Sequence, residues 1–235
     1  MYPKILAIIP ARGGSKGVKR KNVRQVKGIP LIGWTINEAK KSRFIEKIVV
    51  STEDKEISGV SESFGAQVIR RPEMLARDDS PSIDAIFHVL DTLKGKGYVP
   101  EHVILLQPTS PLRIATQIDE ALSKFIENSG LYDSLISVTE QEHPPAWMRT
   151  IDERGYLRDF MAYNKDSQIR RQDFQKVYRL NGAIYIIKTE KLYQNRGFET
   201  DRTLPYIMDD CSSMDIDTEL DLEIAEFLLG RYTDI

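Results

Sequence analysis

The sequence predicts an α/β protein built on a Rossmann-like, mostly parallel sheet. Short continuous apolar runs alternate with segments whose apolar residues repeat at helical spacing, from Ile5 to Val138. Continuous runs are typical of strands buried on both faces, and the alternation favours parallel βαβ units. A loop rich in glycine and lysine follows the first apolar run directly, which predicts a ligand site at the carboxyl ends of the strands.

Local end signals place the individual elements. Pro30 suits the first position of a helix, and Ser80-Pro81 suits an N-cap followed by such a proline. Gly65 is expected to end the helix that starts at Asp54, because glycine readily adopts the left-handed conformation. The expected strands cover residues 5–9, 48–50, 67–70, 103–106, 135–138 and 183–187. The expected helices cover residues 30–41, 54–64, 80–93, 116–126 and 218–229.

Residues 140–178 interrupt this alternation. The stretch contains two adjacent prolines, a turn expected at 152–155 and many charges. We interpret it as an excursion, in the form of a β-ribbon, from one domain that covers residues 1–235. Apolar residues on such an excursion are exposed unless a partner buries them, which predicts a homodimer built through residues 140–178. These apolar residues are Trp147, Met148, Phe160, Met161, Tyr163 and Phe174.

Composition limits the class of function. The 235 residues are 41% hydrophobic and 29% charged, with a net charge of −2, which is typical of a globular chain and argues against general binding to nucleic acid or an anionic membrane. A single cysteine, Cys211, excludes an internal disulfide and a cysteine-based zinc site, so a metal would be a hard cation held by carboxylates. The apolar runs are too short to span a bilayer or to form a signal peptide. We therefore expect a cytoplasmic enzyme.

Residues 11–22 carry the strongest local signal for anion binding. Gly13, Gly14 and Gly17 allow tight turns and can present backbone N–H groups to an anion. The spacing matches neither the P-loop nor the dinucleotide fingerprint, so we expect a different kind of triphosphate loop. The alternative is a solvated basic loop. The cations of this segment are Arg12, Lys16, Lys19, Arg20 and Lys21.

Two carboxylates stand two positions apart near the last expected helix. If this segment is extended, Asp215 and Asp217 point to one face. Carboxylates so placed can share a magnesium ion that also binds phosphate oxygens. The alternative is that Asp217 or Thr218 caps the following helix, and spacing alone leaves both interpretations open. The expected core positions of that helix are Leu220, Ile224, Phe227 and Leu228.

Residues 107–113 follow the fourth expected strand and read Gln-Pro-Thr-Ser-Pro-Leu-Arg. Polar groups at the carboxyl end of a strand can line a substrate cleft, and the two prolines would stiffen the loop. An ordinary β–α turn is an equal alternative.

Together these segments resemble the acylneuraminate cytidylyltransferase family. The resemblance implies a nucleotide-diphospho-sugar transferase type of fold and transfer of CMP from CTP to an acidic nine-carbon sugar. It also implies Mg²⁺ or Mn²⁺ held by Asp215 and Asp217, and a dimer whose arm would lend Arg171 to the neighbouring site. The segments that carry the resemblance are residues 9–17, 21–22, 71–72, 107–113, 181–186 and 214–217.

The resemblance implies a role for each matching residue. The phosphates and part of the nucleotide would be held by Arg12, Gly13, Gly14, Ser15, Lys21 and Asn22. The cytidine would lie along Arg71, Ser80 and Ser82. The sugar would face Gln107, Arg171, Asn181 and Tyr185. The catalytic charges would come from Arg12, Lys21, Asp215 and Asp217.

Two departures from the family pattern leave the sugar open. No basic residue follows His143 closely until Arg149, and only Phe198 stands where the family often has paired phenylalanines. The candidate sugars are N-acetylneuraminate, legionaminate and pseudaminate. The competing functions are a cytidylyltransferase for the eight-carbon lipopolysaccharide acid or for an isoprenoid precursor, and a non-catalytic nucleotide-binding module.

Overall fold

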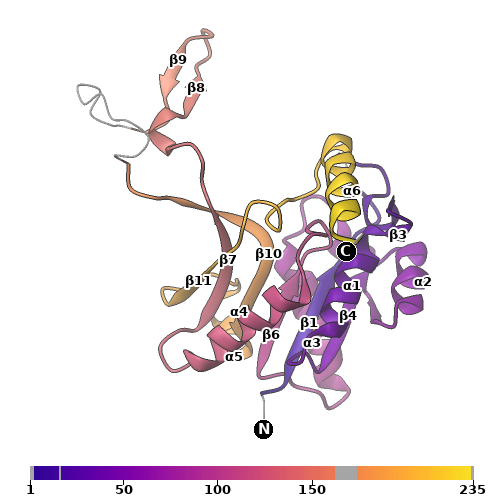
Figure 1. The fold of residues 1–235 in the computed structure, drawn as a ribbon. Coiled ribbons are helices and arrows are strands. Elements are labelled where there is room, and N and C mark those ends of the chain that lie inside the picture. Colours follow the sequence, from indigo (N-terminus) through magenta and orange to yellow (C-terminus); the bar gives the residue numbers. More distant parts are fainter. Residues whose placement is uncertain (1–2, 16, 162–173, 234–235) are drawn as a thin grey trace.

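Seven strands form the central sheet of the computed structural model, which describes residues 3–15, 17–161 and 174–233 (Figure 1). Their order is β11-β7-β10-β6-β1-β4-β5. Neighbouring strands are parallel except at β10, which runs antiparallel to β6 and β7. The expectation of a mostly parallel sheet is therefore confirmed. The strands are β1 (Ile5–Pro10), β4 (Lys47–Thr52), β5 (Gln67–Arg70), β6 (His102–Leu106), β7 (Ser134–Glu140), β10 (Tyr178–Lys188) and β11 (Thr203–Ile207).

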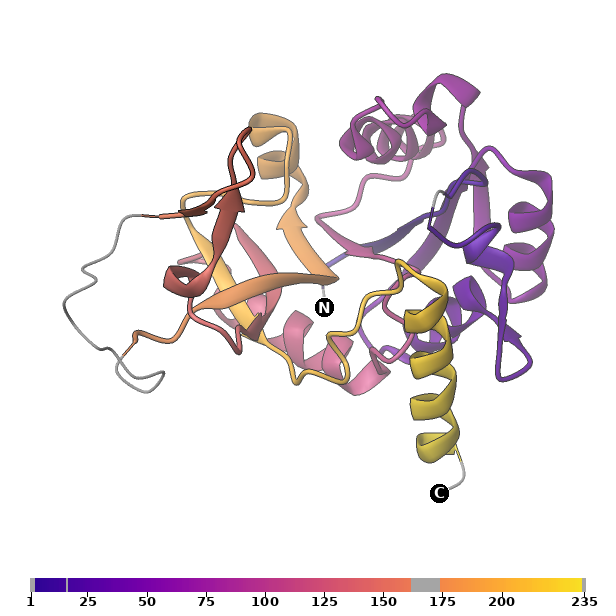
Figure 2. The ribbon, with the colours of Figure 1, turned by 90° about the horizontal axis from the view of Figure 1, so that it is seen from above.

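Helices cover both faces of the sheet because the side chains of a buried strand alternate between two apolar cores. Ile5, Ala7 and Ile9 of β1 face a core shared with α1, α2 and α4. Leu6 and Ile8 face a second core shared with α3 and α5, on the opposite side of the sheet (Figure 2). The helices are α1 (Leu31–Lys41), α2 (Lys55–Ser63), α3 (Ser82–Gly95), α4 (Ala115–Glu127), α5 (Thr189–Asn195) and α6 (Glu219–Thr233). None of the described helices has the length and apolar character needed to cross a membrane.

Short elements complete the fold. Among the described residues, a small hairpin and three turns of 3₁₀ helix were not expected from the sequence. Neither were α5, whose segment is short and polar, and β11, a five-residue strand that contains Pro205. The hairpin strands are β2 (Gln25–Val26) and β3 (Ile29–Pro30). The 3₁₀ turns are η1 (Lys21–Val23), η2 (Glu73–Ala76) and η3 (Pro145–Trp147).

The predicted ends of α2 are confirmed, whereas the predicted start of α3 is wrong. Asp54 caps α2 by accepting bonds from two backbone N–H groups, and Gly65 ends it with a φ of +87°. The predicted N-cap at Ser80 is wrong, because α3 begins only at Ser82 and the Ser80 hydroxyl donates instead to the Met74 carbonyl. The loop before α3 therefore turns Ser80 away from the helix end.

The predicted core face of α6 is wrong at three of its four positions; the fourth, Leu228, packs partly buried against the core. Leu220, Ile224 and Phe227 are exposed, by 63%, 40% and 63%. The helix instead buries Leu222, Ala225 and Leu229 against a small core that includes Val18 and Val26. Because α6 is apolar on more than one side, its periodicity does not select a face; contact with the loop after β1 does.

The excursion contains the expected ribbon. Strands β8 (Arg149–Ile151) and β9 (Leu157–Asp159) pair antiparallel around a turn where Gly155 has a φ of +80°. The ribbon projects away from the sheet (Figure 1). Its apolar side chains stay exposed, by 72% at Ile151 and 69% at Leu157. Tyr163 and Arg171 lie outside the described residues.

Candidate active site

A cleft of about 710 Å³ lies where several strands end. Its lining includes Pro10 at the end of β1, Arg71 directly after β5 and Gln107 directly after β6. This is the position at which open α/β sheets bind ligands. The sequence-predicted residues that line it are Arg12, Ser15, Lys21, Asn22, Arg71, Ser80, Ser82, Gln107, Tyr185 and Asp217. The predicted residues Gly13, Gly14, Asn181 and Asp215 are outside this lining.

The loop of residues 11–22 is folded on itself. The Ser15 hydroxyl donates to the Val18 carbonyl at 2.6 Å and accepts from the Lys21 N–H at 3.1 Å. The buried Asn22 amide donates to the Arg12 carbonyl at 2.9 Å. Ser15 and Asn22 thus shape the loop as well as lining the cleft.

Gly13 serves the packing of this loop. Its N–H donates to the Glu53 carboxylate at 2.6 Å, so that donor is already used. A Cβ at this position would lie 2.6 Å from an oxygen of Asp54. The structure therefore explains Gly13 by close approach to the end of β4, and Gly14 lies exposed outside the cleft.

The cations of the loop diverge. Arg12 pairs with Asp78 at 2.5 Å at the edge of the cleft. Arg20 has a φ of +57° and turns away to pair with Asp54 and Glu56. Its hydrogen bond lowers the pKa of Asp54 to about 2. Among the described cations of the loop, Arg12 and Lys21 line the cleft, whereas Lys16 lies outside the described residues.

Lys21 joins this loop to the aspartate segment nearly 200 residues later. Its Nζ donates to the Ile216 carbonyl at 2.6 Å and to Oδ1 of Asp217 at 3.1 Å. A Cβ at Gly17 would lie 1.9 Å from the Asp217 carbonyl oxygen, so the two backbones can touch only because residue 17 is glycine. The backbone N–H of Ile216 donates to the Thr109 carbonyl at 2.9 Å, which ties the segment to the loop after β6.

The two aspartates differ in surroundings. They lie in an irregular segment between β11 and α6, outside any strand. The Asp217 side chain is 74% exposed and lines the cleft. Oδ1 of Asp215 is buried without a hydrogen-bond partner. Burial raises the pKa of Asp215 and the charge of Asp217 raises it further, against a hydrogen bond from Thr109 and the charge of Lys21.

These donors fit a hard divalent cation. A buried carboxylate oxygen without a partner is costly, and a bound cation would satisfy it. Among the described residues, no group of three or more histidine, cysteine, aspartate or glutamate side chains could hold a metal. Phosphate oxygens and water would therefore have to complete the coordination, as magnesium sites at phosphates commonly do.

The cap of α6 is Thr218. Its hydroxyl accepts from the Asp221 N–H at 3.2 Å, and Asp221 accepts in return from the Thr218 N–H at 2.7 Å. This reciprocal pair is a capping box. Asp217 is left to face Lys21, so capping does not account for its carboxylate.

The end of the cleft beside the basic loop contains a buried arginine. The side chain of Arg71 is 5% exposed, and its Nε donates to Glu53 at 3.0 Å. Because Glu53 also holds Gly13, it fixes Arg71 relative to the loop. Arg77 and Asp78 also line this end and were not predicted from the sequence. Both are charged and lie between two predicted site residues, Arg71 and Ser80, and this position could have identified them.

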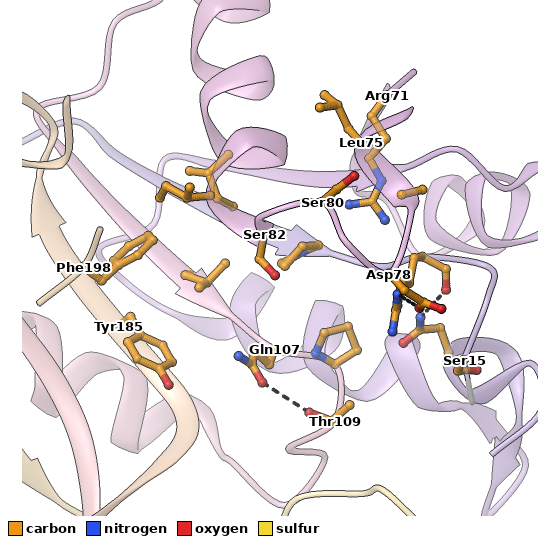
Figure 3. A pocket seen from close by; sticks show the side chains of 18 of the residues that line it. Ser15, Arg71, Leu75, Asp78, Ser80, Ser82, Gln107, Thr109, Tyr185 and Phe198 are labelled. Atoms are coloured by element: carbon orange, nitrogen blue, oxygen red, sulfur yellow. Dashed lines mark hydrogen bonds and ion pairs between the residues drawn. The ribbon is translucent and has the colours of Figure 1, made fainter. Parts of the chain in front are cut away.

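The opposite end is aromatic (Figure 3). Tyr185 and Phe198 form an edge-to-face pair with ring centroids 5.9 Å apart. Burial raises the pKa of Tyr185, and the charges of Asp215 and Glu199 add to the effect, so its hydroxyl stays protonated at neutral pH. Gln107 stands between the two ends. Gly197 and Glu199 also line the cleft and were missed.

Asn181 is buried behind the cleft. Its Oδ1 accepts from the Ser137 hydroxyl at 2.5 Å, and its Nδ2 donates to the Ser213 hydroxyl at 2.9 Å. The prediction that Asn181 faces the sugar is therefore wrong. Asn181 instead connects β7 and β10 to the segment just before the aspartates. The predicted sugar contact Arg171 lies outside the described residues.

Arg113 fixes the loop of residues 107–113. The side chain is fully buried and donates to the carbonyls of Gln107 and Ala183 at 3.2 and 2.7 Å. It also donates to the Thr35 hydroxyl at 2.9 Å. This loop is therefore more than an ordinary turn, because a buried cation holds its start against β10 and α1.

A cleft at the ends of parallel strands, with cations facing a carboxylate pair, defines a phosphate-handling α/β protein of the nucleotidyltransferase class. The cytidylyltransferase family model matches residues 6–229, and the chain belongs to this family. The predicted family is thereby confirmed, and the protein is an enzyme of the nucleotidyltransferase type.

Two curated relatives are equally similar in sequence. The N-acylneuraminate cytidylyltransferase of Escherichia coli O18:K1:H7 is 37% identical over 96% of this chain, which spans only 52% of that protein. The CMP-N,N'-diacetyllegionaminic acid synthase of Legionella pneumophila is also 37% identical, over 96% of both chains. Among solved structures, a CMP:2-keto-3-deoxy-manno-octonic acid synthetase complexed with CTP has a TM-score of 0.72 over 97% of this chain and 99% of that one. At 17% identity this likeness shows the fold alone.

Proposed function

We propose that this chain transfers CMP from CTP to the anomeric hydroxyl of a sialic-acid-like nonulosonic acid and releases pyrophosphate. The observation that carries the proposal is the contact of Lys21 with the aspartate segment at the basic end of the cleft. The names of the two curated relatives support the substrates. The proposed reaction belongs in the cytoplasm, where CTP is available.

The reaction is an in-line displacement at the α-phosphorus, in which negative charge builds on the phosphate oxygens. Preorganised cations are then the main catalytic requirement. Lys21 would stabilise this charge, and Arg12 would exchange the carboxylate of Asp78 for a phosphate oxygen. Mg²⁺ or Mn²⁺ held by Asp215 and Asp217 would supply further positive charge to the phosphates.

Other residues would orient the two substrates. Arg71, Ser80 and Ser82 would lie along the cytidine. Gln107 and Tyr185 would face the sugar, while Asn181 would hold β10, which carries Tyr185, against the segment just before the aspartates. Arg171 stays a predicted sugar contact.

We predict strong nucleotide selectivity. With a nonulosonic acid present, pyrophosphate release should be at least about tenfold faster with CTP than with ATP, GTP or UTP, because a site that hydrogen-bonds one base leaves its polar groups unpaired with another. A coupled phosphate assay over four nucleotides measures this. Equal turnover of all four would refute the proposal.

The same assay separates the alternatives. Turnover with the eight-carbon acid and with no nonulosonic acid would favour the lipopolysaccharide-type enzyme. Binding of CTP without turnover of any acid would favour a nucleotide-binding module.

We also propose a homodimer formed through residues 140–178. Strands β8 and β9 project away from the sheet (Figure 1). Their apolar side chains are exposed, and such side chains commonly mark an interface. Light scattering at micromolar concentration should give twice the chain mass of 26.9 kDa.

Paired substitutions test this interface. Ile151→Asp with Leu157→Asp should yield monomers, because both side chains lie on the ribbon. Leu131→Asp is the matched control, since Leu131 is 68% exposed and lies off the ribbon. A monomeric wild type, or equal dissociation by the control, would contradict the proposal.

A further inference from the structure

The floor of the aromatic end is apolar across three neighbouring strands. Tyr185 of β10 pairs with Leu105 of β6 on one side and with Ile136 of β7 on the other. Directly paired residues point to the same face of a sheet, and all three line the cleft. Phe198 packs edge-to-face on Tyr185. The polar side chains of the described lining nearest to this floor include Tyr185, Glu199 and Gln107.

The charges that line the cleft determine which end of the sugar lies at the basic end and which at the aromatic end. In a 2-keto acid the anomeric carbon carries the carboxylate, so the attacking hydroxyl and the carboxylate lie at the same end of the molecule. Lys21, Arg12 and Arg71 lie at the basic end, whereas Glu199 would repel a carboxylate at the aromatic end. The substituents farthest from the anomeric carbon therefore reach the apolar floor.

Gly197 leaves space beside this floor. It lines the cleft, and the nearest atom to a Cβ built there is the Asn195 carbonyl oxygen, 3.9 Å away. Its φ lies outside the left-handed range, so a side chain is compatible with the backbone. The aromatic end is thus wider than it would be with a side chain at position 197.

We propose that the aromatic end selects a nonulosonic acid with two acylamino groups and a terminal methyl, and that Gly197 provides the room for the second acyl group. This inference rests on the proposed function. A sugar with one acylamino group and a trihydroxypropyl tail would place hydroxyls against Leu105, Ile136 and Phe198, and these three apolar side chains return none of the hydrogen bonds that the hydroxyls lose with water. Acyl and terminal methyl groups gain from the same apolar contact. Overall identity does not separate the two sugars, because both named relatives are 37% identical to this chain.

The test compares two probes at saturating CTP, N,N′-diacetyllegionaminic acid and N-acetylneuraminic acid. Wild-type kcat/KM should be at least about tenfold higher for the diacetyl sugar, the scale on which pockets discriminate by one or two buried groups. Gly197→Phe should lower this selectivity ratio at least about tenfold by filling the space. Gly130→Phe is the matched control, because a Cβ there meets no atom within 4 Å and Gly130 lies outside the cleft lining.

Each outcome decides the inference. Equal or higher kcat/KM for N-acetylneuraminic acid would overturn it and leave the proposed function intact. An unchanged ratio in Gly197→Phe, with a melting temperature close to that of the wild type, would overturn the role of Gly197; if that variant is unfolded, Gly197→Leu is measured in its place. Turnover of neither sugar, and of no pseudaminic acid either, would refute the proposed function and this inference together.

Discussion

Asp215→Asn and Asp217→Asn are each expected to lower kcat by about 10²–10³-fold, the scale on which loss of one electrostatic stabiliser slows an enzyme. Both carboxylates lie beside Lys21, and Oδ1 of Asp215 is buried without a partner. Asparagine keeps the shape of the side chain and removes its charge. Pyrophosphate release over a magnesium titration measures the effect, and a chelator should abolish wild-type activity.

Stability separates the metal role from a structural one. Because Thr218 caps α6, Asp217→Asn should leave the melting temperature unchanged. Thr218→Ala is the matched control: it should cost about 1 kcal/mol of stability and keep the catalytic rate. Full activity of both asparagine variants at low magnesium would rule the metal role out.

Lys21→Ala is expected to lower kcat by about 10²–10³-fold and to change the KM for the sugar by less than about threefold. Its ammonium group faces the carboxylate pair at the cleft and would stabilise charge that develops only in the transition state. Steady-state kinetics with both substrates varied measures the two constants separately.

The structure changes the choice of control for this variant. Arg20 would serve as the comparison if it faced solvent, but it pairs with Asp54 and Glu56, so its loss would disturb the loop. The exposed Lys19 is the better control. Lys21→Gln separates charge from tethering, because its amide can still donate to the Ile216 carbonyl. Equal, mild losses in Lys21→Ala and Lys19→Ala would mean that the loop is merely a basic surface.

Local signals were sufficient for most of the fold. The strand expected at 67–70 matches β5, and Gly65 ends α2 as its conformational freedom predicts. Continuous apolar runs identify buried strands because both faces of the sheet are covered. The antiparallel direction of β10 was not predictable, since an apolar run does not encode which way a strand runs.

The sequence by itself determined the alternating α/β order, the ribbon, and the loop and motif segments that form the cleft. Only the tertiary structure decided which members of each motif face it. The left-handed backbone at Arg20 sends that cation to α2 and leaves Lys21 at the carboxylates. Asn181 is buried because β7 and β10 carry its partners, Ser137 and Ala183. Spacing along a chain restricts which residues can be neighbours, but the path of the backbone through space settles which of them meet.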